Sequence, residues 1–278
     1  MPYRTDLAVE TKKNFGPKDG IEKSVKKEED IEIISINIKT KKAANEVKKP
    51  VGRYITLQHA EILKSYHVEN VEEILAKEIQ KFIKKKEIVL LVGLGNKEIT
   101  SDSIGPLVSN RVVVTRQLDK NLKKIFGFED LRIVSSIAPG VFGKTGIEST
   151  EIVKACCEIV KPEMVVVVDA LAAADIKRLG TTIQLTNTGI CPGSGVQNKR
   201  KELSKNVLGV PVLAIGVPTV VDLKDIKKKA KSQNQEPMIL TLKNIDLVAK
   251  RSAELIANAL NRAFFPTLEK EELKAFYD

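Results

Sequence analysis

Apolar residues in this chain gather into short runs that alternate with polar and amphipathic segments. Three runs are almost wholly apolar, at residues 87–94, 164–170 and 210–217. Continuous stretches of Val, Ile and Leu of this length are typical of strands that are buried on both faces of a sheet. β-branched or alternating stretches predict further strands at residues 31–38, 52–57, 131–138 and 181–186.

Other segments repeat their apolar residues at the spacing of an α-helix. Residues 68–85 carry six apolar side chains at this spacing, and residues 149–161 form a second candidate helix. Residues 244–265 predict a long amphipathic helix, with Asn244 as its N-cap. A further helix is expected over residues 103–118, broken near its start by a Gly-Pro pair.

The alternation of strands and helices predicts an α/β fold, with a mainly parallel twisted sheet covered by helices on both faces. In such folds the functional site lies beyond the carboxyl ends of the strands. Residues 224–237 are polar and are expected to form a surface linker. The side chains that follow the predicted strands are therefore the first candidates for chemistry.

Composition narrows the class of protein. The chain has 278 residues, of which 42% are hydrophobic and 29% charged, as in ordinary globular domains. No apolar run reaches the roughly 20 residues of a membrane span, and the N-terminus lacks the apolar core of a secretory signal. Three cysteines, two of them adjacent, do not form a disulfide framework. These observations predict a cytoplasmic protein without a membrane anchor.

The net charge of +10 raises the question of nucleic-acid binding. The basic residues are interspersed with Glu and Asp, which is typical of solvated helix faces and loops. Aromatic residues make up only 4% of the chain, too few for a row of base-stacking platforms. No direct contact with nucleic acid is expected.

The turn after residues 87–94 looks at first like a phosphate-binding loop. Gly93-Leu94-Gly95 would need a third glycine at position 98, but Glu98 stands there, and no Gly-Lys-Ser/Thr follows. Glu98 and Asp102 would also place negative charge where a phosphate has to bind. The glycines are therefore expected to allow a tight turn that presents Asp102.

A second carboxylate follows another buried run. Four valines lead directly into Asp169, which therefore projects from a strand end or, alternatively, caps the next helix. If Asp102 and Asp169 meet, the two carboxylates cannot both ionise easily. One then holds a proton and the other accepts one, which suits the activation of water and the protonation of a leaving amine.

Other chemistries find less support in the sequence. Histidine occurs only at positions 59 and 67, and Pro192 breaks the Gly-x-Ser-x-Gly pattern around Ser194. Cys191 has no evident basic partner, and no Cys/His spacing suggests zinc. No cofactor or metal is expected, although a metal held by the two aspartates stays an alternative. Backbone N–H groups of two glycine-containing loops are candidate oxyanion donors: Gly95, Asn96, Gly193, Ser194 and Gly195.

Several stretches, taken together and in order, resemble the germination protease family of spore-forming Firmicutes. They cover nearly the whole chain, and as a set they are highly specific. The stretches are RTDLAVE (4–10), GRYITL (52–57), VGLGN (92–96), TSDSIGP (100–106), APGVFGKTGIES (138–149), VVVDALAA (166–173), GICPGSGVQNKRKE (189–202) and VPVLAIGVPTVVD (210–222).

This resemblance implies the α/β peptidase fold of hydrogenase-maturation endopeptidases and an atypical aspartic endopeptidase. The implied substrates are small acid-soluble spore proteins, cleaved in the spore core at germination. The family's proposed catalytic aspartates fall on Asp102 and Asp169, which the strand-end argument also selects. The family is made as a zymogen that trims its own N-terminus and assembles into a homotetramer.

The family prefers an acidic residue, a hydrophobic residue and alanine across the cut. Asp6-Leu7-Ala8 fits this preference, so processing is expected between Asp6 and Leu7, with a propeptide of residues 1–6 and a single peptidase domain of residues 7–278. The chain departs from the common family pattern at four positions, which bear on substrate positioning, activation and oligomer contacts: Ala174, Asn187, Cys191 and Gln197.

Two alternative functions remain open at this point. The first is a metal-dependent peptidase of the hydrogenase-maturation type, which a chelator would inactivate. The second is a non-catalytic module that binds spore proteins or nucleic acid, which would bind without cleaving.

Overall fold

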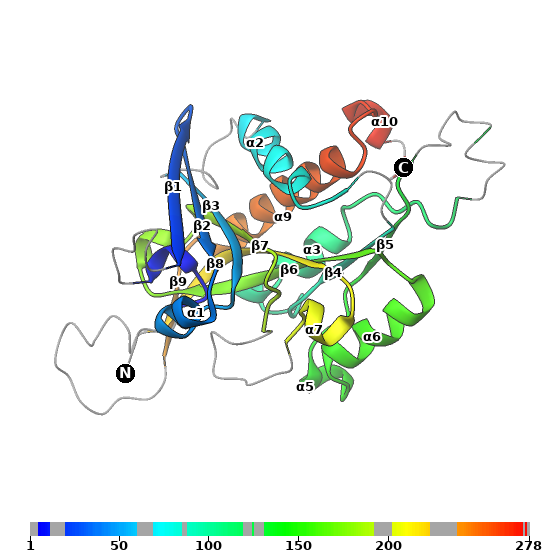
Figure 1. Ribbon diagram of the computed structural model, residues 1–278. Coiled ribbons are helices and arrows are strands. Elements are labelled where there is room, and N and C mark those ends of the chain that lie inside the picture. The colour runs from blue at the N-terminus through cyan, green and yellow to red at the C-terminus, as the bar shows by residue number, and fades with distance from the viewer. Residues whose placement is uncertain are drawn as a thin grey trace.

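The computed structural model contains one mixed β-sheet with helices against both of its faces (Figure 1). The strand order is β1-β2-β3-β7-β8-β6-β4-β5, and β9 pairs with β8. The strands are β1 (Ile21–Glu28), β2 (Ile31–Ile38), β3 (Gly52–Gln58), β4 (Val89–Gly93), β5 (Val134–Ile137), β6 (Met164–Ala173), β7 (Thr182–Thr186), β8 (Val212–Asp222) and β9 (Ile239–Thr241). The structure describes residues 5–11, 20–59, 69–84, 88–118, 124, 131–191, 202–222, 238–274 and 276.

One half of the sheet is parallel. Strands β8, β6, β4 and β5 run in the same direction, so their carboxyl ends meet at one edge of the sheet. The valines of β6 at positions 165–168 are fully buried, as expected for a strand covered on both faces. The strands predicted at residues 87–94, 131–138, 164–170 and 210–217 are all present here.

The other half of the sheet is antiparallel, so the expected mainly parallel arrangement describes only part of it. β1, β2, β3 and β7 pair antiparallel in that order, and β7 joins them to β8. β1 was not expected from the sequence. Most of its residues are exposed and charged, so it lacks the apolar alternation that marks a half-buried strand. It is held by its hairpin with β2, whose turn uses Glu29 with a φ of 53°.

Helices cover the two faces of the sheet unequally. In Figure 1, α2, α9 and α10 lie above the sheet, and α1, α5, α6 and α7 lie below it. The helices are α1 (Lys41–Val47), α2 (Glu69–Gln80), α3 (Ile104–Ser109), α5 (Phe142–Thr145), α6 (Ser149–Val160), α7 (Lys205–Leu208), α9 (Ile245–Phe264) and α10 (Lys270–Lys274), with 3-10 turns η1 (Ala8–Glu10), η3 (Thr100–Asp102) and η4 (Ile176–Arg178).

The largest apolar cluster joins α2, α3 and α9 to the upper face. Leu75 of α2, Ile104 of α3 and Leu260 of α9 pack in one cluster with Val166 and Leu213 of the sheet. The helices predicted at residues 68–85, 149–161 and 244–265 are α2, α6 and α9, and Asn244 stands at the N-cap of α9. Burial of these apolar helix faces is the main stabilising contribution on this side.

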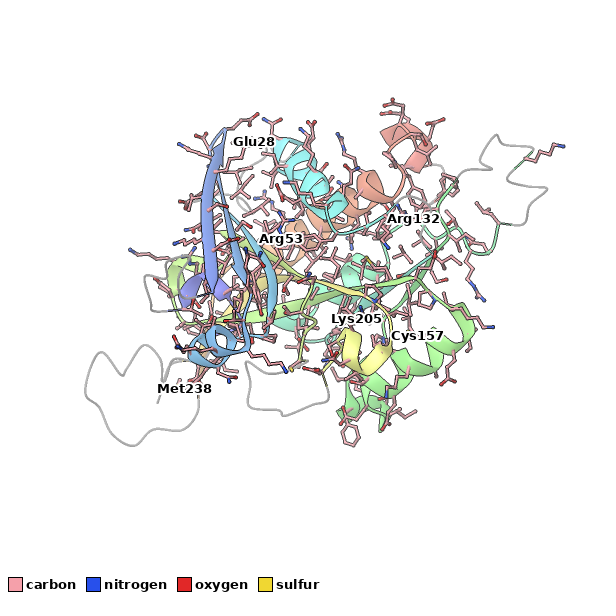
Figure 2. All side chains as sticks on the ribbon, in the orientation of Figure 1. Glu28, Arg53, Arg132, Cys157, Lys205 and Met238 are labelled. Atoms are coloured by element: carbon pink, nitrogen blue, oxygen red, sulfur yellow. The ribbon has the colours of Figure 1, made fainter. Side chains whose placement is uncertain are left out.

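The lower face carries smaller clusters. α6 packs Val153 against Leu90 and Val165, and α1 packs Ala43 against Ile34 of β2. In Figure 2, the labels of Cys157 and Lys205 mark α6 and α7 on this side of the sheet.

The helix expected over residues 103–118 is shorter than predicted. α3 ends at Ser109, and the chain then runs beside β5, where the N–H groups of Thr115 and Arg116 donate to Val134 O at 3.0 and 3.1 Å. Three consecutive β-branched valines, at positions 112–114, favour this extended course over a helix. The prediction for residues 110–118 was therefore wrong.

A buried arginine, two residues before β5, contacts the chain after α2 and the last residue of α9. Arg132, labelled in Figure 2, donates from Nη2 to Lys84 O at 2.8 Å, and its guanidinium lies 5.8 Å from the Phe264 ring centroid. Only 8% of its surface is exposed, so these contacts compensate the burial of its charge.

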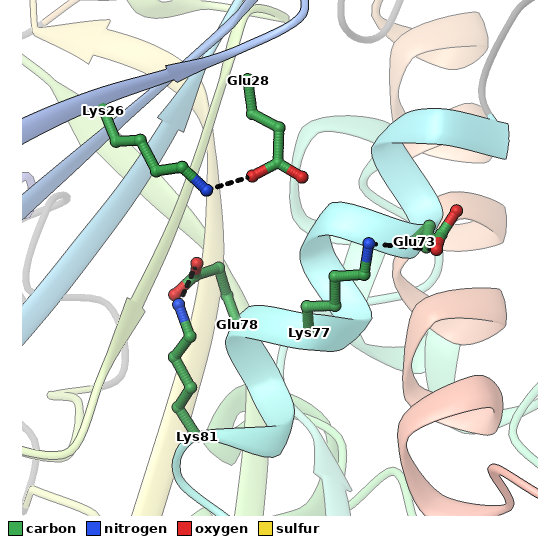
Figure 3. Close-up of polar contacts among 6 residues, drawn as sticks. All are labelled: Lys26, Glu28, Glu73, Lys77, Glu78 and Lys81. Carbon is green, nitrogen blue, oxygen red and sulfur yellow. Dashed lines mark hydrogen bonds and ion pairs between the residues drawn. The ribbon is translucent and has the colours of Figure 1, made fainter.

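The surface around β1 and α2 carries paired charges. Figure 3 shows Lys26 with Glu28, Lys77 with Glu73 and Lys81 with Glu78. Such pairs agree with the interpretation of the mixed charge runs as solvated faces.

Among the described residues, no helix has the length and apolar content needed to cross a bilayer. The predicted linker at residues 224–237 lies outside the described residues, and the domain limits stay a prediction.

Candidate active site

Asp169 lies within β6, where the strand passes the end of its neighbour β4. Gly93, the last residue of β4, pairs with Val168, so Asp169 is one residue beyond that end. Only 5% of Asp169 is exposed, and its Oδ1 accepts the N–H of Ala170 at 2.9 Å. β6 continues to Ala173, so Asp169 does not cap a following helix. The carboxylate is therefore held in the sheet at the edge expected for a site.

Asp102 reaches the same edge through a tight turn after β4. Its Oδ2 accepts the N–H of Asn96 at 2.8 Å, and Gly95 has a φ of 116°. A Cβ at Gly95 would lie 2.0 Å from Asp102 O, so only glycine allows this approach. The expected tight turn is therefore present, and it holds the Asp102 carboxylate. An oxyanion role for Gly95 and Asn96 stays a prediction.

A second glycine brings α3 against the strand ends. A Cβ on Gly105 would lie 2.1 Å from Leu94 O and 2.5 Å from Val168 O. Gly105, in the first turn of α3 and three residues after Asp102, therefore contacts the backbone of Leu94, directly after β4, and of Val168 in β6. This close approach fixes Asp102 relative to Asp169, because each is within three residues of a contacting atom.

Both aspartates line one cavity. It has a volume of about 410 Å³, and Asp6 lines it together with Asp102 and Asp169. A second cavity of about 240 Å³ adjoins it, because Asp6, Leu171, Ile190 and Cys191 line both. The second cavity is also lined by Lys49, Tyr54 and Gln184. The cleft is thus acidic at the aspartate end and mixed at the other.

The N-terminal segment, residues 5–11, is docked in this cleft. The Asp6 N–H donates to Ala172 O at 2.9 Å, and Asp6 Oδ2 accepts the Ala172 N–H at 2.8 Å. Leu7 is fully buried in a cluster with Leu171, Leu179 and Val221. Residues 1–4 of the expected propeptide lie outside the described residues.

Two charged side chains anchor the ends of this segment. Lys49 Nζ donates to Thr5 O at 2.7 Å, and burial lowers the pKa of Lys49, which the carboxylates of Asp6 and Glu10 partly oppose. Glu10 accepts the N–H groups of Ala174 and Asp175 at 2.8 and 2.9 Å. The segment is therefore fixed by main-chain, apolar and charged contacts together.

Cys191 borders both cavities and is exposed. Although the residue is exposed, partial desolvation of its thiol raises the pKa of Cys191, as do the Glu202 and Asp6 carboxylates, while Lys49 opposes this. A thiol with a raised pKa is mostly protonated at neutral pH and is a poor nucleophile. Among the described residues, no group of three or more His, Cys, Asp or Glu side chains is arranged to hold a metal ion.

The remaining predicted positions are only partly placed. Gly193, Ser194, Gly195 and Gln197 lie outside the described residues. Asn187 Oδ1 accepts the N–H of Arg53 at 2.8 Å and so joins β3 to the end of β7. The other unusual position, 174, contributes its backbone N–H to Glu10, as described above, and this contact does not depend on its side chain.

Sequence reasoning missed Gln184, Lys49 and Glu10. Gln184 is 4% exposed and follows Ile183 in a short strand, where a polar residue suggests a solvent-facing side chain. The segment RTDLAVE could be singled out from the sequence. Its contacts with Ala172 of β6 and Gln184 of β7 could not, because these residues are far apart in the sequence.

Comparisons with known proteins identify the family of the chain. The Germination protease family profile matches residues 4–232. A germination protease of Clostridium acetobutylicum is 36% identical over 322 residues, covering 98% of each chain. One from Caldanaerobacter subterraneus subsp. tengcongensis is 37% identical over 316 residues, covering 98% of this chain and 97% of the relative. One from Bacillus pumilus is 46% identical over 237 residues, covering 79% and 63%.

Among solved structures, a [NiFe] hydrogenase maturation protease, HycI from Thermococcus kodakarensis KOD1, is similar to part of the chain. It is 21% identical, with a TM-score of 0.37, covering 66% of this chain and 98% of that structure. The Clostridium and Caldanaerobacter relatives match over almost the full length of both chains, and all three relatives agree in family. The chain therefore belongs to the germination protease family.

Proposed function

We propose that this chain is an endopeptidase that begins the degradation of small acid-soluble spore proteins during germination, with Asp102 and Asp169 as its catalytic pair. The observation that carries the proposal is that these two carboxylates, which arrive from different parallel strands, line one cavity of about 410 Å³. A peptide segment of the chain itself reaches the same cavity through Asp6.

The pair would work by sharing a proton. One carboxylate takes a proton from water, which attacks the peptide carbonyl, while the other is protonated and polarises the carbonyl or protonates the leaving amine. Backbone N–H groups hold one oxygen of each carboxylate, from Asn96 and from Ala170. This fixes the orientation of both groups before substrate arrives. No cofactor is required for this chemistry.

The same site would process the chain. We infer that it is made as a zymogen and cut between Asp6 and Leu7, which releases the propeptide of residues 1–6. Support comes from the docking of this segment beside the aspartates, where Asp6 is hydrogen-bonded to Ala172, three residues after Asp169. The mature domain would comprise residues 7–278.

The family resemblance supports two further parts of the proposal. The mature chain would assemble into a homotetramer and act in the cytoplasm of the spore core. One chain has a mass of 30.7 kDa, and light scattering of the purified protein is expected to give four times this mass. A monomer would contradict this part of the proposal alone.

Asn variants of the two aspartates test the catalytic pair. We expect Asp102→Asn and Asp169→Asn each to lower the cleavage rate of a small acid-soluble spore protein about 10²- to 10⁴-fold, since each loses one acid–base group. Mass spectrometry would follow both this cleavage and the loss of residues 1–6. Asp175→Asn is the matched control, because Asp175 is exposed and accepts a hydrogen bond from its near neighbour Lys177.

Two outcomes would contradict the proposal. Full activity of either cavity variant removes that residue from the mechanism. Loss of wild-type activity on chelation, restored by a divalent metal, favours the metal-dependent alternative over the aspartate pair.

A further inference from the structure

We propose that the side-chain amide of Gln184 binds the peptide backbone on both sides of the bond that is cut, and donates a hydrogen bond to the carbonyl that is attacked. This inference rests on the proposed function, because it takes the docked segment as a guide to how substrate binds. It adds a binding group on β7 to the two carboxylates on the parallel half of the sheet.

The contacts of Gln184 lie on either side of Leu7, the residue that follows the bond that is cut. Its Nε2 donates to Asp6 O at 3.1 Å, and its Oε1 accepts the N–H of Ala8 at 2.7 Å. Asp6 O belongs to the peptide bond between Asp6 and Leu7. The amide therefore holds the carbonyl of this bond and the N–H of the next peptide bond, as a neighbouring strand would hold the backbone groups on either side of one residue.

Burial indicates that the segment, or a peptide like it, is the partner that Gln184 requires. The side chain is 4% exposed, and a buried amide without hydrogen bonds is costly. The neighbours Ile183 and Leu185 point to the opposite face, into the cluster under α2 and α9. An apolar side chain would fill the same space without the cost of burying a polar group.

The sheet register places Gln184 on the same face of the sheet as Asp169, two strands away. Gly216 of β8 pairs with Gln184 on one side and with Asp169 on the other. Paired residues in neighbouring strands project from the same face, so the amide and the Asp169 carboxylate leave one face about 10 Å apart, two strand spacings of about 4.8 Å. A peptide can span this gap with its carbonyl between them.

The side chains on either side of the clamped bond fill defined pockets. Leu7 is fully buried with Leu171 and Leu179, and Ala8 is 1% exposed in a cluster with Tyr54. The Asp6 carboxylate accepts the Ala172 N–H. The groove therefore takes an acidic, then a large aliphatic, then a small residue, with Gln184 reading only the backbone.

The first experiment measures the clamp without catalysis. In full-length Asp169→Asn protein, which keeps residues 1–6, hydrogen exchange would be followed at the amide of Ala8. We expect Gln184→Ala to speed this exchange about 10- to 100-fold, because the acceptor is lost. Thr56→Val is the matched control: Thr56 pairs with Gln184 in the register, is fully buried, and its hydroxyl has no partner among the described residues.

The second experiment tests the role in cleavage, using the self-processed chain and the peptide Arg-Thr-Asp-Leu-Ala-Val-Glu, residues 4–10 of this sequence. Gln184→Glu keeps the acceptor but loses the donor to the attacked carbonyl, so it is expected to lower kcat about 10-fold or more with a smaller change in KM. Gln184→Ala loses both contacts and is expected to lower kcat and raise KM. Thr56→Val is expected to match the wild type.

A modified peptide separates binding from general destabilisation. N-methylation of the alanine amide removes the donor that Oε1 accepts, and we expect it to reduce wild-type kcat/KM about 10-fold. The same modification is expected to have little further effect in Gln184→Ala, because the two changes remove one contact.

Equal losses on methylation in wild type and variant, or unchanged exchange at Ala8, would overturn the assignment of Gln184. Failure of the proposed function looks different. If Asp169→Asn still cleaves at the wild-type rate, the catalytic pair is wrong, while the methylated peptide, compared in wild type and Gln184→Ala, still reports on Gln184.

Discussion

The two halves of the sheet contribute different kinds of groups to one cleft. In the parallel half, Asp102 and Asp169 are positioned by backbone: each accepts a main-chain N–H, and glycines allow the close approach. In the antiparallel half, Gln184 and Tyr54 are buried side chains around a docked peptide. Reactive groups and peptide-holding groups thus come from separate halves of the sheet, so substitutions should affect them separately.

The largest effect is expected where backbone contacts backbone in the parallel half. Gly105→Ala would place a Cβ 2.1 Å from Leu94 O, an atom that cannot move without shifting β4. We expect the free energy of unfolding to fall by about 3 kcal/mol, together with loss of peptidase activity because Asp102 is displaced. Urea unfolding followed by circular dichroism measures the change.

Gly143→Ala is the control for this substitution. Gly143 lies in the short helix α5, and a Cβ there meets nothing within 4 Å. Alanine at this position should leave stability unchanged or raise it by up to about 1 kcal/mol. Similar losses in both variants would show that the site does not depend on the close approach of α3.

An intermediate effect is expected in the antiparallel half at high pH. Burial raises the pKa of Tyr54 to about 12, from an ordinary value of 10.0, and its hydroxyl donates to Pro50 O at 2.9 Å. The unfolded chain loses this proton first, so stability present below pH 10 should fall by about 2–3 kcal/mol between pH 10 and pH 12. Tyr54→Phe should lack this decrease.

The nearby Lys49 acts in the opposite direction. Burial lowers the pKa of Lys49, so its contribution to stability increases as the pH rises toward 10.5. This contribution is present in both wild type and Tyr54→Phe, so the difference between their denaturant unfolding curves isolates Tyr54. Parallel pH profiles for the two proteins would refute the assigned burial effect.

The smallest effect is expected for the exposed polar contacts. Lys77 lies 3.0 Å from Glu73 on the surface of α2, with about half of each side chain exposed. We expect Lys77→Ala to change the free energy of unfolding by less than about 0.5 kcal/mol. Thermal unfolding of Lys77→Ala, Glu73→Ala and the double variant measures the coupling. A coupling above about 1 kcal/mol would mean that surface charges rival the buried contacts of the cleft.

Local patterns sufficed to predict the parallel half from sequence. β4, β6 and β8 are continuous apolar runs, and α6 and α9 repeat apolar residues at helical spacing. Asp102 and Asp169 follow such runs, which is why both could be selected as candidates. The closing of one cavity around them needed coordinates, because it depends on the turn at Gly95 and on the approach of Gly105.

The antiparallel half escaped prediction for physical reasons. β1 has charged residues at most positions, and its pairing depends on β2. Gln184 meets Ala8 across 176 residues of sequence, so no local period reports the contact. A single glutamine in a strand is indistinguishable by pattern from a solvent-facing residue until its partner is placed.

β1 also has a consequence for how copies of this protein meet. It forms one end of the strand order and presents Lys23, Lys26 and Lys27 along a mostly exposed strand. Like charges facing one another across a shared boundary repel, which discourages a second molecule from extending the ribbon there. Aggregation through this edge strand is thereby disfavoured.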